Sequence, residues 1–179
     1  PAGAITVAGD HVAIDPAVCG GCGMCGAVCP SGAAQTAFPP IDGSLTSLAN
    51  LLHYYGEAGG TAAQLLLHDG QWGGEMIDML ARYGKGLPAA LIPYEMHSVG
   101  RVGHDLLAGA VTLGFERVFV LMDPRKGPEY ASLHQQIELA EALLTGTGVV
   151  SKNRFVLIDE SDPDEVEQIF WQKAKTSTV

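Results

Sequence analysis

The chain has 179 residues, of which 47% are hydrophobic and 17% charged, and its formal net charge is −10. This apolar content is enough for a packed core and excludes a disordered chain, while the negative charge disfavours nucleic acid as a partner, because a phosphate backbone would be repelled. No apolar stretch is long enough to span a bilayer, so we expect no direct membrane insertion.

The chain begins with a predicted hairpin that leads into a run of cysteines. Residues 4–15 read as two short alternating strands joined by a turn at Gly9 and Asp10. This hairpin leads directly into the cysteines.

The cysteine run has the spacing C-x-x-C-x-x-C-x-x-x-C-P, which is typical of iron–sulfur ligation. Its members are Cys19, Cys22, Cys25 and Cys29, the only cysteines in the chain. Three thiolates spaced three apart can converge on three irons of one cubane, and the glycines between them let backbone amides point at the sulfurs. We therefore predict that these four residues are the metal and cofactor ligands of a [4Fe-4S] cluster.

The hairpin, the cysteines and the residues after them, Pro30 and Gly32-Ala33, resemble half of a bacterial ferredoxin over residues 4–38. In two-cluster ferredoxins the fourth cysteine of such a run ligates the other cluster. The resemblance thus implies that Cys29 serves a second cluster and that the near cluster takes its fourth ligand from elsewhere. Alternatively, all four thiolates hold one cluster or metal ion locally. Because the sequence opens at Pro1 without an initiator Met, we expect a fragment of a longer polypeptide that carries the first half upstream.

Zinc is the main alternative occupant, since soft thiolates also favour a tetrahedral zinc site. Structural zinc sites usually divide their ligands between two well-separated C-x-x-C pairs, whereas here one short run ends in Cys-Pro. Disulfides fit less well, because cysteines three apart on a tight coil do not easily reach bridge geometry. Thiolate ligands without a disulfide framework indicate a reducing compartment, and we expect a cytoplasmic protein.

A change of pattern near residues 38–43, where two prolines and a glycine interrupt the chain, predicts a domain boundary. We expect an iron–sulfur module over residues 1–40 and an α/β domain over 44–179. Ser44 is the expected cap of a helix through Gly56. Predicted strands at 63–68, 89–94, 117–122 and 154–158 alternate with predicted helices at 74–83, 102–113, 130–144 and 164–174. This alternation favours βαβ units. The expected fold class is an α+β ferredoxin-like half-module followed by a flavodoxin-like sandwich with a four-stranded parallel sheet.

The second domain also resembles a known family, the delta subunit of methyl-viologen-reducing hydrogenases, over roughly residues 62–174. The segments that carry the resemblance are Leu91-Ile-Pro93, Ser98-Val-Gly-Arg101, the run from Ala110 to Val120, Gly127-Pro-Glu-Tyr130 and Arg154. Members of that family place cysteines for a second iron–sulfur site where this chain has Ser98, Asp123 and Pro128. The resemblance therefore implies that the domain has kept the fold and lost that cluster.

Several charged side chains are expected at the carboxyl ends of the strands, where open α/β sheets bind ligands: His97, Arg101, His104, Asp123, Arg125 and Lys126. No G-x-G-x-x-G follows a strand, so a capping or docking role is favoured over a nucleotide site. Motifs that pair a nucleophile with a base are also missing, and we expect no catalysis by the chain alone.

The predicted function is electron transfer through the [4Fe-4S] cluster, as a subunit or fragment of a larger oxidoreductase. By resemblance, the expected partners are hydrogenase, heterodisulfide reductase or formate dehydrogenase complexes. Two other hypotheses stay open: a zinc-stabilised interaction module, and a flavin- or nucleotide-binding oxidoreductase domain.

Overall fold

A computed structural model describes residues 3–150 and 152–174 of the chain; Pro1, which bears on the expectation of a longer polypeptide, lies outside them. The amino-terminal part contains strands β1 (Ile5–Ala8) and β2 (His11–Ile14) and the short helix α1 (Met24–Val28). The remainder contains α2 (Ile41–Glu57), β3 (Gln64–Asp69), α3 (Trp72–Tyr83), β4 (Leu91–Met96), α4 (His104–Leu113), β5 (Arg117–Leu121), α5 (Ala131–Gly146), β6 (Phe155–Ile158) and α6 (Pro163–Ala174). Two 3-10 turns follow strands, η1 (Val99–Arg101) after β4 and η2 (Pro124–Tyr130) after β5.

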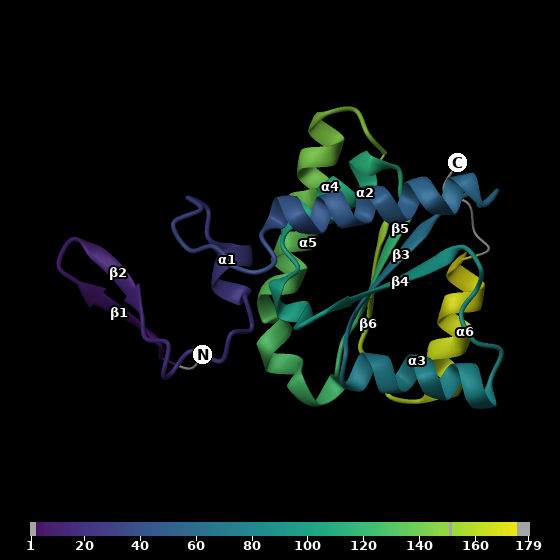
Figure 1. The fold of residues 1–179 in the computed structure, drawn as a ribbon, viewed down its shortest axis with the longest axis horizontal. Coiled ribbons are helices and arrows are strands. Elements are labelled where there is room, and N and C mark those ends of the chain that lie inside the picture. The colour runs from purple at the N-terminus through teal and green to yellow at the C-terminus, as the bar shows by residue number, and fades with distance from the viewer. Residues whose placement is uncertain (1–2, 151, 175–179) are drawn as a thin grey trace.

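The predicted hairpin is confirmed, and it projects from the rest of the molecule (Figure 1). Its strands pair antiparallel with Ile5 opposite Ile14 and Val7 opposite Val12, so these four apolar side chains share one face. All four are exposed, Val7 to 84%. The hairpin thus presents an apolar face to solvent.

The second part is an α/β sandwich around one parallel sheet, as the strand and helix pattern predicts. The strand order is β4-β3-β5-β6, which is the order of the first four strands of a flavodoxin-like sheet. Helices α2, α4 and α5 cover one face, and α3 and α6 cover the other (Figure 1). The observed strands and the four helices after them agree with the predicted ranges to within two residues.

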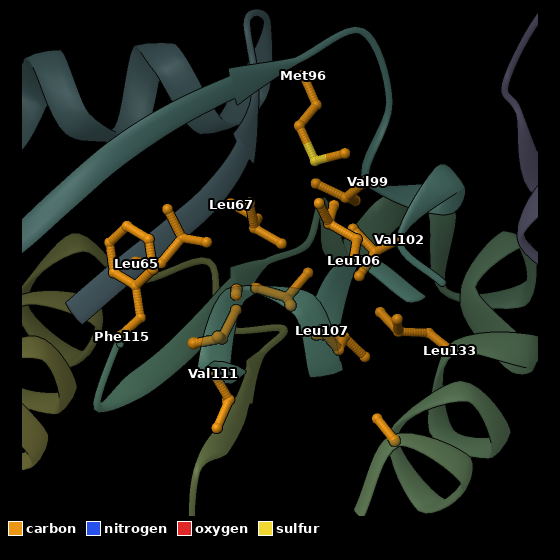
Figure 2. Packing of buried hydrophobic residues seen from close by; sticks show 14 of the residues in the cluster. Leu65, Leu67, Met96, Val99, Val102, Leu106, Leu107, Val111, Phe115 and Leu133 are labelled. Carbon is orange, nitrogen blue, oxygen red and sulfur yellow. The ribbon is translucent and has the colours of Figure 1, made fainter. Parts of the chain in front are cut away.

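Alternating side chains of the central strands supply both halves of the core. In β3, Leu65 and Leu67 pack toward α4, whereas Leu66 packs toward α3 and α6. The larger half continues past the end of β4, where Val99 and Val102 lie within it beside Met96 and Leu106 (Figure 2). The loop after β4 is therefore anchored on the hydrophobic core.

The prediction that Ser44 caps the first long helix is wrong, because α2 begins at Ile41, directly after Pro40. Ser44 is only 3% exposed, and its amide donates to the carbonyl of Pro40 at 3.1 Å. A proline before the first turn is already extended, and Asp42 places an acid near the positive end of the helix. Pro40 and Asp42 therefore indicate the start of this helix better than Ser44 does. Among the described helices, none is long and apolar enough to cross a membrane.

Candidate metal centre

A tight turn carries the chain from the hairpin into the cysteines. The carboxylate of Asp15 accepts from the amide of Ala17 at 2.9 Å, and its carbonyl accepts from the amide of Cys19 at 2.9 Å. The amide of Asp15 itself donates to the carbonyl of Ala4 at 2.8 Å, which closes the base of the hairpin. Cys19 is thereby fixed at the start of the loop, with its side chain exposed.

The other three cysteines lie on or beside α1 and are half-buried. Gly23 is the residue before the helix and has a φ of 77°, a left-handed conformation that a side chain would strain. Gly21, with a φ of 68°, turns the chain in the same sense between Cys19 and Cys22. The sequence analysis missed α1, because five residues with a glycine among them give no helical period.

The thiol of Cys29 already has hydrogen-bond donors directed at it. The amide of Ala34 donates to Sγ of Cys29 at 3.4 Å, and Oγ of Ser31 lies 3.6 Å from the same sulfur. These contacts, that with Ala34 first, lower the pKa of Cys29 to about 7. An amide that stabilises a thiolate in this way is the outer contact that iron–sulfur ligands use.

The four thiols lie on one loop, but they do not converge on a common position that a metal ion could occupy. Within residues 3–150 and 152–174, no group of three or more His, Cys, Asp or Glu side chains is arranged to hold a metal ion. The donor chemistry nevertheless fits a cluster: four soft thiolates, left-handed glycines between them and an amide on the last sulfur. A metal or cluster held by all four thiols would require the loop to close around it.

The cysteine loop, residues 19–29, packs against the loop that follows β4. A Cβ atom added at Gly23 would lie 2.7 Å from Cβ of Arg101, and one at Gly103 would lie 3.2 Å from the carbonyl oxygen of Ala27. The guanidinium of Arg101 donates to the carbonyl of Pro39 at 2.7 Å, beyond the end of the cysteine loop. The two loops therefore contact each other through backbone atoms at Gly103 and Ala27, and Arg101 contacts the cysteine loop at Gly23 and the segment beyond its end at Pro39.

A cavity of about 660 Å³ lies where the cysteine loop faces the carboxyl edge of the sheet; we call it the sheet-edge cavity. Cys22 and Met24 line it from the loop, and Gln71, His97 and Lys126 line it from the segments after β3, β4 and β5. The location matches the crevice where doubly wound sheets bind ligands.

A second cavity, of about 380 Å³, lies on the α2 and α4 side of the loop; we call it the helix-side cavity. Cys29, Arg101, His104, Asp42 and Asp105 are among its lining residues.

The charged residues expected together at the sheet edge are thus divided among separate places. His97 and Lys126 face the sheet-edge cavity, whereas Arg101 and His104 face the helix-side cavity. Asp123 and Arg125 bind each other, with distances of 2.8 Å for both side-chain hydrogen bonds. They do not form one site.

Two of the positions where the resemblance implies cysteines are helix caps. Oγ of Ser98 accepts from the amide of Gly100 at 3.1 Å and starts η1. The carboxylate of Asp123, 1% exposed, accepts from the amide of Arg125 at 3.0 Å and starts η2. The hydrogen bonds from the Arg125 side chain hold the pKa of Asp123 below its ordinary value. Pro128, the third position, lies outside the described side chains.

Arg101 is expected at the carboxyl edge of the sheet, and the structure places it against the cysteine loop, a contact that no signal in the sequence predicts. Compared with known proteins, the chain matches no family model and no curated sequence.

Proposed function

We propose that the chain transfers electrons through a [4Fe-4S] cluster held by Cys19, Cys22, Cys25 and Cys29. The observation that carries the proposal is the iron–sulfur spacing of these thiols on a loop whose last sulfur already accepts an amide hydrogen bond. When bound, such a cluster takes up and releases one electron at a time.

The residues of the chain have two tasks in this function. The thiolates bind iron, and the amide of Ala34 lowers the electron density on the Cys29 sulfur, which favours the reduced state. The α/β domain supplies a rigid support for the loop and an acidic surface for a partner.

We further propose that the chain works inside a larger redox protein, in a reducing compartment such as the cytoplasm. The exposed apolar face of the hairpin, with Ile5, Val7, Val12 and Ile14, supports an assembled state, because such faces mark contacts with other protein surfaces. By resemblance, hydrogenase, heterodisulfide reductase and formate dehydrogenase complexes are the settings that fit.

The direct test is iron, sulfide and zinc content of anaerobically purified protein, with an electron paramagnetic resonance spectrum after reduction with dithionite. We expect iron and sulfide in equal amounts and the signal of a reduced cubane. Zinc without sulfide would contradict the proposal and favour the zinc-stabilised interaction module.

A flavin site is the second candidate, and the sheet-edge cavity is the observation that favours it. Its volume of about 660 Å³ lies within the range of roughly 300–1,000 Å³ for small-molecule sites. The start of α3, however, is already served by a carboxylate: Oδ1 of Asp69 accepts from the amide of Gly73 at 2.9 Å. A phosphate at that helix start would meet this negative charge. If the site binds flavin at all, riboflavin should therefore bind at least as tightly as flavin mononucleotide, measured by fluorescence quenching.

A further inference from the structure

The segment from Ser98 to Gly103 follows the edge strand β4 and carries the cysteine loop. Packing in the hydrophobic core holds its conformation, because Val99 and Val102 are 0% and 1% exposed there (Figure 2). A hydrogen bond within the segment also stabilises it, because the hydroxyl of Ser98 caps η1. Arg101 lies between the two buried valines and extends in the opposite direction, toward the cysteine loop.

Arg101 makes two different contacts with the amino-terminal module. Its Cβ packs against Gly23, the residue between Cys22 and the start of α1, so closely that a Cβ added at Gly23 would lie 2.7 Å away. Its guanidinium donates to the carbonyl of Pro39 at 2.7 Å, on the far side of Cys29. One side chain thus holds the loop at points before and after the last two cysteines.

The charge of Arg101 also bears on the proposed cluster. Arg101 lines the helix-side cavity together with Cys29. The other ionisable side chains that line this cavity are His104, Asp42 and Asp105. A cation close to the cluster favours the electron-rich state. With Arg101 removed, no arginine or lysine would remain among the described residues that line this cavity.

We infer that the Ser98–Gly103 segment is the structural support, or seat, of the cysteine loop. We also infer that Arg101 is a positioning residue that raises the reduction potential of the proposed cluster. The part about the potential rests on the proposed function; the part about the seat does not. Neither part needs a ligand of the cluster to change.

The experiment uses the full chain and three substitutions at Arg101. Arg101→Met keeps a long unbranched side chain and loses the charge, Arg101→Lys keeps the charge and loses the planar guanidinium, and Arg101→Ala loses everything beyond the Cβ, so the contact with Gly23 remains in all three. Arg82→Met is the matched control, because Arg82 is an exposed arginine on α3 whose side chain pairs only weakly with Asp78 at 3.5 Å.

The seat is tested in metal-free protein by hydrogen exchange of residues 19–39. Because a hydrogen bond from a charged donor is lost, exchange in Arg101→Ala should be about tenfold faster or more in this segment, and unchanged in β3 and β5. Arg101→Met loses the same hydrogen bond and should resemble Arg101→Ala, whereas Arg101→Lys keeps a charged donor and should lie between these two and wild type. Exchange equal to wild type in all three variants would overturn the seat.

The role of the charge is tested by redox titration of the loaded protein, followed by electron paramagnetic resonance and compared at equal iron content. Arg101→Met should have a midpoint potential below that of wild type, and Arg101→Lys and Arg82→Met should stay near wild type. A purely structural role would not separate Met from Lys, so equal potentials would overturn this part. If wild-type protein forms no cluster, the proposed function and the charge role both fail, while hydrogen exchange still decides the seat.

Discussion

Three glycines of the cysteine loop allow backbone strain to be separated from close packing. Gly20 has an ordinary φ and open space around it, Gly21 has a left-handed φ of 68° and open space, and Gly23 has a left-handed φ of 77° with Arg101 against it. Changing each to alanine adds the same methyl group. The three variants therefore differ in the backbone conformation at the substituted residue and in what the methyl group meets.

The costs follow from these surroundings. Gly20→Ala should change the free energy of loop opening by less than about 0.5 kcal/mol, apart from a small gain because alanine is less free in the unfolded chain. Gly21→Ala should cost about 1–2 kcal/mol for the left-handed backbone alone. Gly23→Ala adds the overpacking of a Cβ atom that would lie 2.7 Å from Cβ of Arg101 and 3.4 Å from Oγ1 of Thr36, about 1–3 kcal/mol more.

Hydrogen exchange of the amides of Gly26 and Ala27 reports on this opening, because both donate to the carbonyl of Gly23, at 3.1 and 3.2 Å. Since each 1.4 kcal/mol is roughly a tenfold change, exchange should be about tenfold faster in Gly21→Ala and faster by roughly thirtyfold or more in Gly23→Ala. Iron retention should fall in the same order. Equal exchange rates in Gly21→Ala and Gly23→Ala would refute the close contact with Arg101, and an effect of Gly20→Ala as large as either would refute the whole ranking.

Three further predictions test other parts of the molecule. If Cys29 serves a second cluster, Cys22→Ser should abolish the near cluster while Cys29→Ser keeps most of its iron; equal iron loss, by metal analysis, would mean that all four thiols hold one local cluster. Phe170→Ala removes a fully buried ring in edge contact with Phe119, at 6.0 Å between centroids, and should cost about 3–5 kcal/mol in urea unfolding without changing iron per folded molecule. Asp123→Asn should lower stability at pH 7 by about 1 kcal/mol, because it weakens a charged hydrogen bond. Since the folded pKa of Asp123 is lowered, its contribution is present above the unfolded pKa near 4 and is lost as the pH falls through the folded value, so the gap between wild type and Asp123→Asn should narrow in acid. A gap that stays constant with pH would contradict this reasoning.

The sheet and its helices could be read from the sequence because their signals are periodic and local. The run Val118-Phe-Val-Leu121 is apolar on both faces, and the structure buries all of it under helices on both sides. The start of α2 was misplaced because Ser44 is a good cap residue by type, whereas its burial depends on packing that no local pattern encodes.

The site was only partly accessible to the same reasoning. The cysteine spacing is a local signal, and it predicts the ligands without any knowledge of the fold. The contacts of Arg101 with Gly23 and Pro39 join segments far apart in sequence, so nothing in the neighbourhood of either segment predicts them. The division of the charged residues between two cavities was missed for the same reason, because strand order alone places them all at one edge.

The hydrogen bond between Arg101 and Pro39 spans 62 residues of chain, and this separation has a consequence for maturation in the cell. During synthesis the cysteines leave the ribosome well before the segment that supports them. Contacts of long sequence separation form late, so a newly made cysteine loop has nothing to rest on until β4 and α4 have folded. Its thiols are exposed to oxidation during that interval. For the proposed cluster, delivery is therefore best suited to a chain whose α/β domain is already complete, and reconstitution in the laboratory should begin from folded, reduced protein.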